Sequence, residues 1–470
     1  MRVALTGRLN VFRRWLADII TPAHDHARAE WTRPIERQVH TLDHWRSLLA
    51  FPKTIECSQM ELLGRDHEEP LFVGPGRIEI RSETDIRFFV YASASDPSLA
   101  ALRLMHAQRN PYDVEAQFRL FATDYRGTEW GCGYTPLEFF ADHNHGWPLG
   151  GQIDGMHALA KGAFVSTSSS VELLFVPPIE LPTAETLKTI AQIGDERIFS
   201  SSARGRQKLD LLGSEIAFSY EPSGEALWVT ASTASGFNHP FAENWLSEPL
   251  RILLGTPVYP RLVARNMGDG TAQVWLRPSP RQKRPSVIGL QPPFTVLGIK
   301  PAEFWQLYGA LLNMIAKAGG FEAHEVTRFY DELADAQHGS RWVLTMTLAN
   351  VAEALADSLM EDTDRRSEYS DDALASMKKH IKAFSDHDAL RGRMLSNLGM
   401  VSKRSVVAFM RGLGASAVVN PDHVQTWYAI RNSVMHGNLV DPWSSEEGDG
   451  HLREMLDLVH ALTRERVRRA

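Results

Sequence analysis

Cysteine is scarce in this sequence, and long hydrophobic runs are missing. The 470 residues include two cysteines, Cys57 and Cys132, which are too few for a disulfide framework and indicate a reducing compartment. No stretch approaches the roughly 18–20 consecutive apolar residues of a membrane-spanning helix. We therefore expect a cytoplasmic protein without a membrane span.

An excess of positive charge is also missing. The chain has 50 Lys and Arg against 57 Asp and Glu, a formal net charge of −7. This balance excludes a globally basic nucleic-acid binder, although it leaves room for a local basic patch. With 43% hydrophobic and 23% charged residues, the composition is typical of a globular protein, and the length predicts two or three domains.

The common cofactor and metal motifs do not occur. The sequence has no phosphate-binding G-x-x-x-x-G-K-[ST] loop, no dinucleotide-binding G-x-G-x-x-G pattern and no G-x-S-x-G elbow. The densest group of metal-ligand residue types is Asp142-His143-Asn144-His145, with His157 downstream. Without a C-x2-C pair or an H-E-x-x-H pattern, we interpret it as a polar surface loop and expect neither metal nor cofactor.

Residues 1–50 are predicted to form an N-terminal helical segment. Apolar residues repeat at helical spacing between Val11 and Ile20. We interpret this stripe as an amphipathic helix that docks on its own protein, and the alternative is a helix that lies on a membrane surface.

Residues 51–280 are predicted to be rich in β-structure. Apolar residues alternate with polar ones at Ile78 and Ile80, Ile86 and Phe88, Phe118 and Leu120, Val171, Leu173 and Phe175, Leu227 and Val229, and Val274 and Leu276. This period of two is typical of half-buried strands in antiparallel sheets. Two helices are expected within this region, over residues 183–193 and 243–254.

The amino-acid composition changes after this region, where proline becomes frequent. Five prolines fall between residues 278 and 293, so we predict a proline-rich linker over residues 281–299. Apolar residues then recur at helical spacing near residues 304–315, 344–359, 373–384, 390–398, 406–410, 421–436 and 451–468. The predicted fold class is α+β multidomain, with a β-rich N-terminal region followed by an all-α bundle over residues 300–470.

The segment from Asn420 to Asn438 carries the most informative motif. Asn420 is a good N-cap, Pro421 suits the first helical position, and Gly437 with Asn438 supplies a stop. On the predicted helix Arg431 falls in the middle of the apolar stripe, where an unpaired charge is costly.

The arrangement Arg431-Asn432-x-x-x-His436, preceded by Trp427-Tyr428, resembles the HEPN superfamily (higher eukaryotes and prokaryotes nucleotide-binding), and within it the Apea-like group. The resemblance covers about residues 300–470. It implies a metal-independent endoribonuclease that dimerises with its two motifs facing each other across the twofold axis. Such domains occur in prokaryotic toxin and anti-phage systems, where cutting RNA halts growth.

The implied chemistry requires little of the protein, because RNA supplies its own 2′-hydroxyl nucleophile. His436 would act as general acid or base, and Arg431 would hold the phosphate and stabilise its developing charge. Asn432 would orient His436, which is four residues away, or hydrogen-bond the phosphate. The implied partners are RNA, a second copy of the chain and a phage-derived trigger, with the β-rich region as sensor or regulator.

Two alternatives remain open. Basic residues at the C-terminus are either RNA contacts or a solvated helix end: Arg464, Arg466, Arg468 and Arg469. The helical region is either a nuclease or a non-catalytic module that dimerises or binds a partner. In a nuclease Arg431 should lie in an accessible cleft with His436, whereas in a structural bundle a buried carboxylate should neutralise it.

Overall fold

The computed structural model describes residues 40–470 except 66, 111–112, 141–145, 184–185, 194–195, 281–285, 292–300, 321, 368, 402, 439 and 441. From His40 onward the chain clusters as one compact unit. The predicted N-terminal helix over residues 11–20 lies outside the described residues. The unit begins with α2 (Thr41–Trp45) and the short 3-10 helix η1 (Arg46–Leu49).

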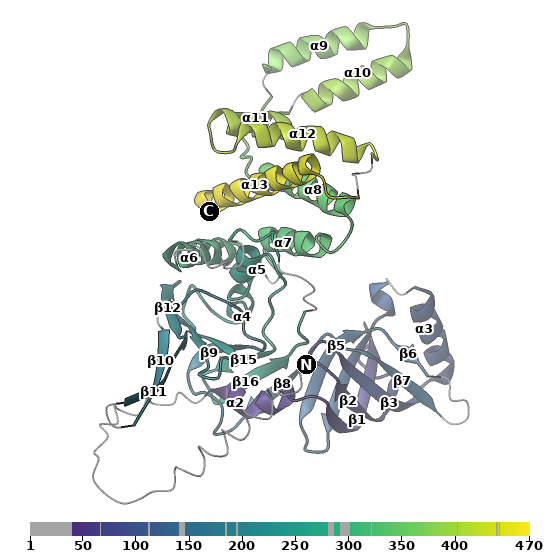
Figure 1. Ribbon diagram of the computed structural model, residues 1–470. Coiled ribbons are helices and arrows are strands. Elements are labelled where there is room, and N and C mark those ends of the chain that lie inside the picture. Colours follow the sequence, from purple (N-terminus) through teal and green to yellow (C-terminus); the bar gives the residue numbers. More distant parts are fainter. Residues whose placement is uncertain are drawn as a thin grey trace, which may run out of the picture. The chain divides into compact units, whose positions relative to one another are not determined.

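Antiparallel strands make up most of the N-terminal half (Figure 1). In the described chain 14 strands form one sheet in the order β12-β13-β14-β9-β15-β16-β8-β5-β4-β1-β2-β3-β7-β6. Their bounds are β1 (Lys53–Gly64), β2 (Phe72–Ile80), β3 (Ile86–Ala94), β4 (Phe118–Asp124), β5 (Glu129–Thr135), β6 (Glu138–Phe139), β7 (Trp147–Gln152), β8 (Met156–Lys161), β9 (Ser169–Phe175), β12 (Arg206–Leu211), β13 (Ser214–Tyr220), β14 (Leu227–Ser232), β15 (Leu262–Met267) and β16 (Thr271–Leu276).

The alternation of apolar and polar residues correctly predicted six of these strands, β2, β3, β4, β9, β14 and β16. In β3, for example, Ile86, Phe88 and Val90 are buried while Arg87 and Phe89 are half-buried. Each pair of alternating residues singled out in the sequence lies within a strand, because a strand directs successive side chains to opposite faces of the sheet.

The prediction of a helix over residues 183–193 is wrong. Residues of this segment form β10 (Thr186–Ile193), which pairs antiparallel with β11 (Glu196–Arg204) in a separate two-stranded sheet. Thr186, Thr189, Ile190 and Ile193 are β-branched, a composition that favours strands. The pairing that makes this segment a strand is not visible in the segment itself, since the hydrogen-bonding partner lies in the next segment of the chain.

The second helical segment that was predicted within the sheet region is present. The segment 243–254 is helical but divided, with α4 (Ala242–Trp245) followed by α5 (Glu248–Leu254). Pro249 lies in the first turn of α5, where its missing N–H has no helical partner to lose. A further helix, α3 (Pro97–Arg109), lies between β3 and β4.

The C-terminal half is helical, as the 3.6-residue periodicity predicted. Its helices are α6 (Pro301–Ala318), α7 (Glu325–Ala336), α8 (Arg341–Ser358), α9 (Asp371–Ala383), α10 (Asp388–Val401), α11 (Val406–Ala415), α12 (Pro421–Met435) and α13 (Glu446–Arg469). Sequence analysis missed α7, although its buried residues Val326, Tyr330 and Leu333 follow the helical spacing.

One hydrophobic core joins the two halves. Phe218 of β13 contacts the rings of Trp305 and Tyr308 of α6, with centroid distances of 4.7 and 5.4 Å. The Trp305 indole also donates a hydrogen bond to the carbonyl of Pro182 at 2.7 Å. The first strands of the sheet surround a separate hydrophobic cluster that includes Phe72.

Part of the predicted linker belongs to this shared core. Residues 286–291 are described, and Ile288 and Leu290 are each 1% exposed. The Leu290 amide donates to Ile252 of α5 at 3.1 Å, and His460 of α13 lies 2.8 Å from the Ile288 carbonyl. Residues 288–290 are therefore buried between α5 and α13, whereas Val287 beside them is 68% exposed.

Candidate functional site

The motif helix α12 begins and ends where the sequence predicts. The Asn420 side chain accepts a hydrogen bond from the Asp422 amide at 3.0 Å. At the other end Gly437 has a φ of +81°, and the amides of Gly437 and Asn438 donate to the carbonyls of Val434 and Ser433. This is the Schellman arrangement, which satisfies carbonyls that the helix end leaves unpaired.

The buried face of α12 holds it against α8. Trp427 is completely buried, and its indole nitrogen donates to the Ala349 carbonyl of α8 at 3.0 Å. Val424 and Val434 are each 4% exposed. The apolar stripe predicted around Arg431 is present at these three positions, whereas Tyr428 is 38% exposed.

Arg431 is paired with Glu353 of α8. Its Nε donates to Glu353 Oε2 at 2.7 Å and its Nη2 to Oε1 at 2.9 Å. The side chains are 28% and 34% exposed respectively, so the pair lies at the surface. The hydrogen bonds that Arg431 donates to Glu353 raise the pKa of Arg431, which keeps the guanidinium cationic.

Sequence analysis missed Glu353, although a signal was present. It is the first charged residue of α8 after Arg341, in an otherwise apolar or weakly polar stretch. A charge at such a position needs a partner, and the mid-stripe arginine of α12 needs one too.

The pairing geometry leaves one edge of the Arg431 guanidinium available. The carboxylate occupies the side edge formed by Nε and Nη2. Nη1 is 3.5 Å from Asn432 Oδ1, which is at the outer limit of a hydrogen bond. Because the guanidinium has five donors in a planar fork, its end edge can still bind an oxyanion.

The expected contact between Asn432 and His436 is not made by their side chains. His436 is the C-cap, with φ −87° and ψ 7°, and its backbone amide donates to the Asn432 carbonyl at 3.2 Å. The His436 side chain is exposed. Asn432 instead turns its side-chain oxygen toward Arg431, so the arrangement brings Arg431 and Asn432 together and leaves the imidazole open to solvent.

A second arginine lies beside the motif. The Arg411 guanidinium of α11 is 5.3 Å from the centroid of the Tyr428 ring, and no acidic partner of Arg411 is found among the described residues. Tyr428 is one turn before Arg431 on α12. Arg411 was not predicted from the sequence, because nothing in the local sequence of α11 indicates that the Arg411 side chain contacts an aromatic ring of α12.

The four C-terminal arginines are engaged within the chain. Arg464 donates to the Leu290 carbonyl at 3.2 Å, and Arg466 is 3.4 Å from Glu325. Arg468 and Arg469 both bind Glu465, at 2.6 and 2.7 Å. None of these partners is shared with Arg431, and a role of the four in RNA binding stays a prediction.

The remaining candidate ligands do not assemble into a site. Residues 142–145 lie outside the described part of the chain, and His157 is on β8 against Gly131 of β5. Asp386 and His387 lie between α9 and α10. In the described ranges no group of three or more His, Cys, Asp or Glu is placed to hold a metal ion. Cys57 and Cys132 are free and buried.

No protein-family model, curated protein or solved structure matches this chain. Among the described helices, none combines the length and the apolar character that crossing a membrane requires.

Proposed function

We propose that the helical region is a metal-independent endoribonuclease of the HEPN type. The observation that carries the proposal is the surface position of Arg431, which Glu353 holds by its side edge while the end edge stays available. His436 follows at the exposed end of the same helix. A positioned arginine and an accessible imidazole are the two groups that cleavage through the 2′-hydroxyl requires.

RNA is the substrate that the surroundings of Arg431 favour. Tyr428 offers a partly exposed ring and Arg411 lies over it. An exposed aromatic ring beside cations is the combination that stacks bases and neutralises phosphates in single-stranded nucleic-acid binding. Because the net charge of the chain is −7, RNA would depend on this local patch rather than on long-range attraction.

In the proposed reaction the protein acts on one phosphodiester. The end edge of Arg431 binds the non-bridging oxygens and stabilises the charge that develops as the 2′-oxygen attacks phosphorus. The bond from phosphorus to the 5′-oxygen breaks, which leaves a 2′,3′-cyclic phosphate. His436 either removes the 2′-hydroxyl proton or gives a proton to the departing 5′-oxygen.

A homodimer is part of the proposal. Positions 431 and 436 of a straight helix point roughly 140° apart, so one phosphate is not easily reached by both side chains of one copy. Arg431 from one subunit and His436 from the other would complete a site across a twofold axis. In the cell such cleavage would arrest growth, as in anti-phage defence, with a phage-derived trigger acting through the β-rich region.

The test is cleavage of RNA by the purified full-length protein in the presence of EDTA. We expect His436→Ala and Arg431→Ala each to lower the cleavage rate by about 10² or more, with unchanged circular dichroism. A matched control is His423→Ala, which removes a half-buried imidazole from the first turn of the same helix. Undiminished cleavage by His436→Ala would sink the proposal.

A second candidate is a non-catalytic binding module. The observation that favours it is the two-point pairing of Arg431 with Glu353, which is also what a structural ion pair looks like. The two candidates differ in a simple measurement. If growth arrest on expression needs neither Arg431 nor His436, the helical region is a binding module.

A further inference from the structure

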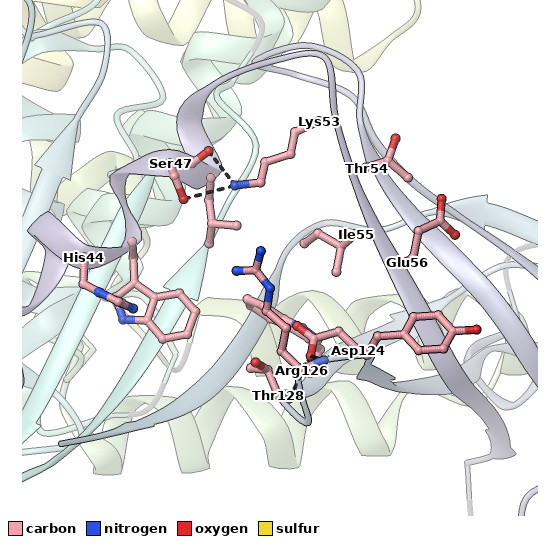
Figure 2. A pocket seen from close by; sticks show the side chains of 13 residues that line it. His44, Ser47, Lys53, Thr54, Ile55, Glu56, Asp124, Arg126 and Thr128 are labelled. Atoms are coloured by element: carbon pink, nitrogen blue, oxygen red, sulfur yellow. Dashed lines mark hydrogen bonds between the residues drawn. The ribbon is translucent and has the colours of Figure 1, made fainter.

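A pocket in the β-rich region is formed by residues that are distant in sequence from the motif helix α12. It has a volume of about 440 Å³, which is within the range of small-molecule sites, roughly 300–1,000 Å³. Its walls come from α2 and η1, the first residues of β1, and the turn between β4 and β5 (Figure 2). The pocket combines two cations with aromatic side chains.

The turn between β4 and β5 is rigidly built. The buried Asp124 carboxylate accepts hydrogen bonds from the backbone amides of Arg126 and Thr128 at 2.8 and 2.9 Å. It also accepts one from the Trp130 indole at 3.3 Å. Asp124 is therefore occupied by the turn itself, and the turn fixes where the side chain of Arg126 begins.

The opposite wall carries Lys53. Its ammonium group donates to the backbone carbonyl and the hydroxyl of Ser47, at 2.8 and 3.0 Å, which are neutral acceptors. Figure 2 shows the side chains of Lys53 and Arg126 extending into the same space. Burial and the neighbouring charge of Arg126 lower the pKa of Lys53, as expected of two cations that share a site.

No carboxylate in the described part of the chain pairs with either cation. Glu56 also lines the pocket, but positions 54 and 56 of β1 face away from positions 53 and 55. Figure 2 shows the Glu56 carboxylate on the other side of the strand. Two positive charges thus face the pocket, and within the described structure neither forms an ion pair with the Asp124 or Glu56 carboxylate of the lining.

Aromatic groups complete the lining. Trp45 and Trp130 pack edge to face at 5.7 Å between ring centroids. The Trp45 indole N–H is buried and has no hydrogen-bond acceptor in the described structure, so this side chain presents ring surface rather than a donor to the pocket. Tyr125, next to Arg126 on the turn, is 73% exposed and offers a free ring face.

We propose that this pocket binds a small phosphate monoester that carries a planar ring, of which a mononucleotide is the reference ligand. The phosphate lies between Lys53 and Arg126, and the ring stacks on the exposed aromatic surface of Tyr125. The site belongs to the β-rich region and does not depend on the nuclease proposal, since no residue is common to the two sites.

The experiment is isothermal titration calorimetry of the full-length protein with AMP, adenosine, ribose 5-phosphate and inorganic phosphate. We expect AMP to bind, and adenosine, ribose 5-phosphate and phosphate to bind at least about tenfold more weakly, because each lacks one of the two recognised parts. Arg126→Ala and Lys53→Met should each weaken AMP binding by about tenfold or more.

Matched controls are Arg109→Ala on α3 and Lys161→Met on β8, which remove exposed cations outside the pocket. Both should bind AMP like the unchanged protein. The proposal is overturned if AMP gives no saturable binding, if adenosine binds as tightly as AMP, or if Arg126→Ala leaves the affinity unchanged. Circular dichroism of each variant separates loss of binding from loss of folding.

Discussion

The sheet region and the helical region each contain an arginine paired with a glutamate, but the two pairs differ in burial. In the sheet region Arg265 donates through Nε and Nη2 to Glu243, and the side chains are 18% and 3% exposed. In the helical region the corresponding exposures of Arg431 and Glu353 are 28% and 34%. The same chemistry is buried in one region and accessible in the other.

The surroundings of the two arginines explain the difference. Arg265 also donates to Gln273 and to the Pro240 carbonyl, and it lies over the Trp275 ring at 4.9 Å. Every edge of that guanidinium is used inside the protein. Arg431 has its end edge available, and this is the property that lets an arginine bind a substrate rather than only join two elements.

Breaking the buried pair should have the largest effect on stability. Glu243→Gln leaves the Arg265 charge without its carboxylate, and we expect the free energy of unfolding to fall by about 3–5 kcal/mol. Urea denaturation followed by circular dichroism measures the change. Glu215→Gln is the control, because Glu215 pairs with Lys208 at the surface and should change stability by less than about 1 kcal/mol.

A change in the accessible pair should affect RNA cleavage strongly and stability only weakly. Arg431→Lys keeps the charge but loses the planar fork, so we expect RNA cleavage to fall by about 10² while the free energy of unfolding changes by about 1 kcal/mol or less. Cleavage assays and urea denaturation of the same preparation test both halves of the statement. A loss of stability as large as that of Glu243→Gln would remove the distinction between the two pairs.

Removing the carboxylate of the accessible pair should have a smaller effect. Glu353→Gln retains one acceptor for Arg431 but not the charge, and we expect about a tenfold loss of cleavage because the guanidinium is held less firmly. Thr426→Ala is a control on α12, since the Thr426 hydroxyl donates to Glu454 of α13 and not to the accessible pair. Enhanced cleavage by Glu353→Gln would show that the carboxylate competes with the phosphate.

The smallest expected effect concerns the C-terminal arginines. Hydrogen bonds from Arg468 and Arg469, together with their positive charges, lower the pKa of Glu465 to about 2, although burial acts in the opposite direction. A depressed carboxyl pKa stabilises the fold above the unfolded value of about 4.3 and loses this contribution as the pH falls toward 2.

We therefore expect the unfolding free energy of the unchanged protein to exceed that of Glu465→Gln by about 1 kcal/mol at pH 6. The difference should shrink as the pH approaches 2. Urea titrations of both proteins at pH 6 and pH 3 measure it, and a pH-independent difference would contradict the assignment.

Sequence patterns predicted local structure well because the signals are local. The N-cap at Asn420 and the stop at Gly437 depend on residues within one helical turn. The alternation in β3 reflects the pleat of a single strand. The failure at residues 186–193 has the complementary reason, since the hydrogen bonds that make this segment a strand come from β11.

The candidate site was predictable only in part. Arg431, Asn432 and His436 could be singled out because their spacing on one helix follows from the sequence. Glu353 and Arg411 could not be placed beside them, because their contacts join different helices. Glu353 is 78 residues before Arg431, and Arg411 is 17 residues before Tyr428.

The sequence by itself determined the division into a β-rich half and a helical half, the ends of the motif helix and the identity of its polar residues, because these depend on periodicity and caps. Only the tertiary structure decided that residues 288–290 are core, that Glu353 holds Arg431 at the surface, and that Lys53 and Arg126 face one pocket. These outcomes depend on which distant segments meet, and packing and pairing across the whole chain set those contacts.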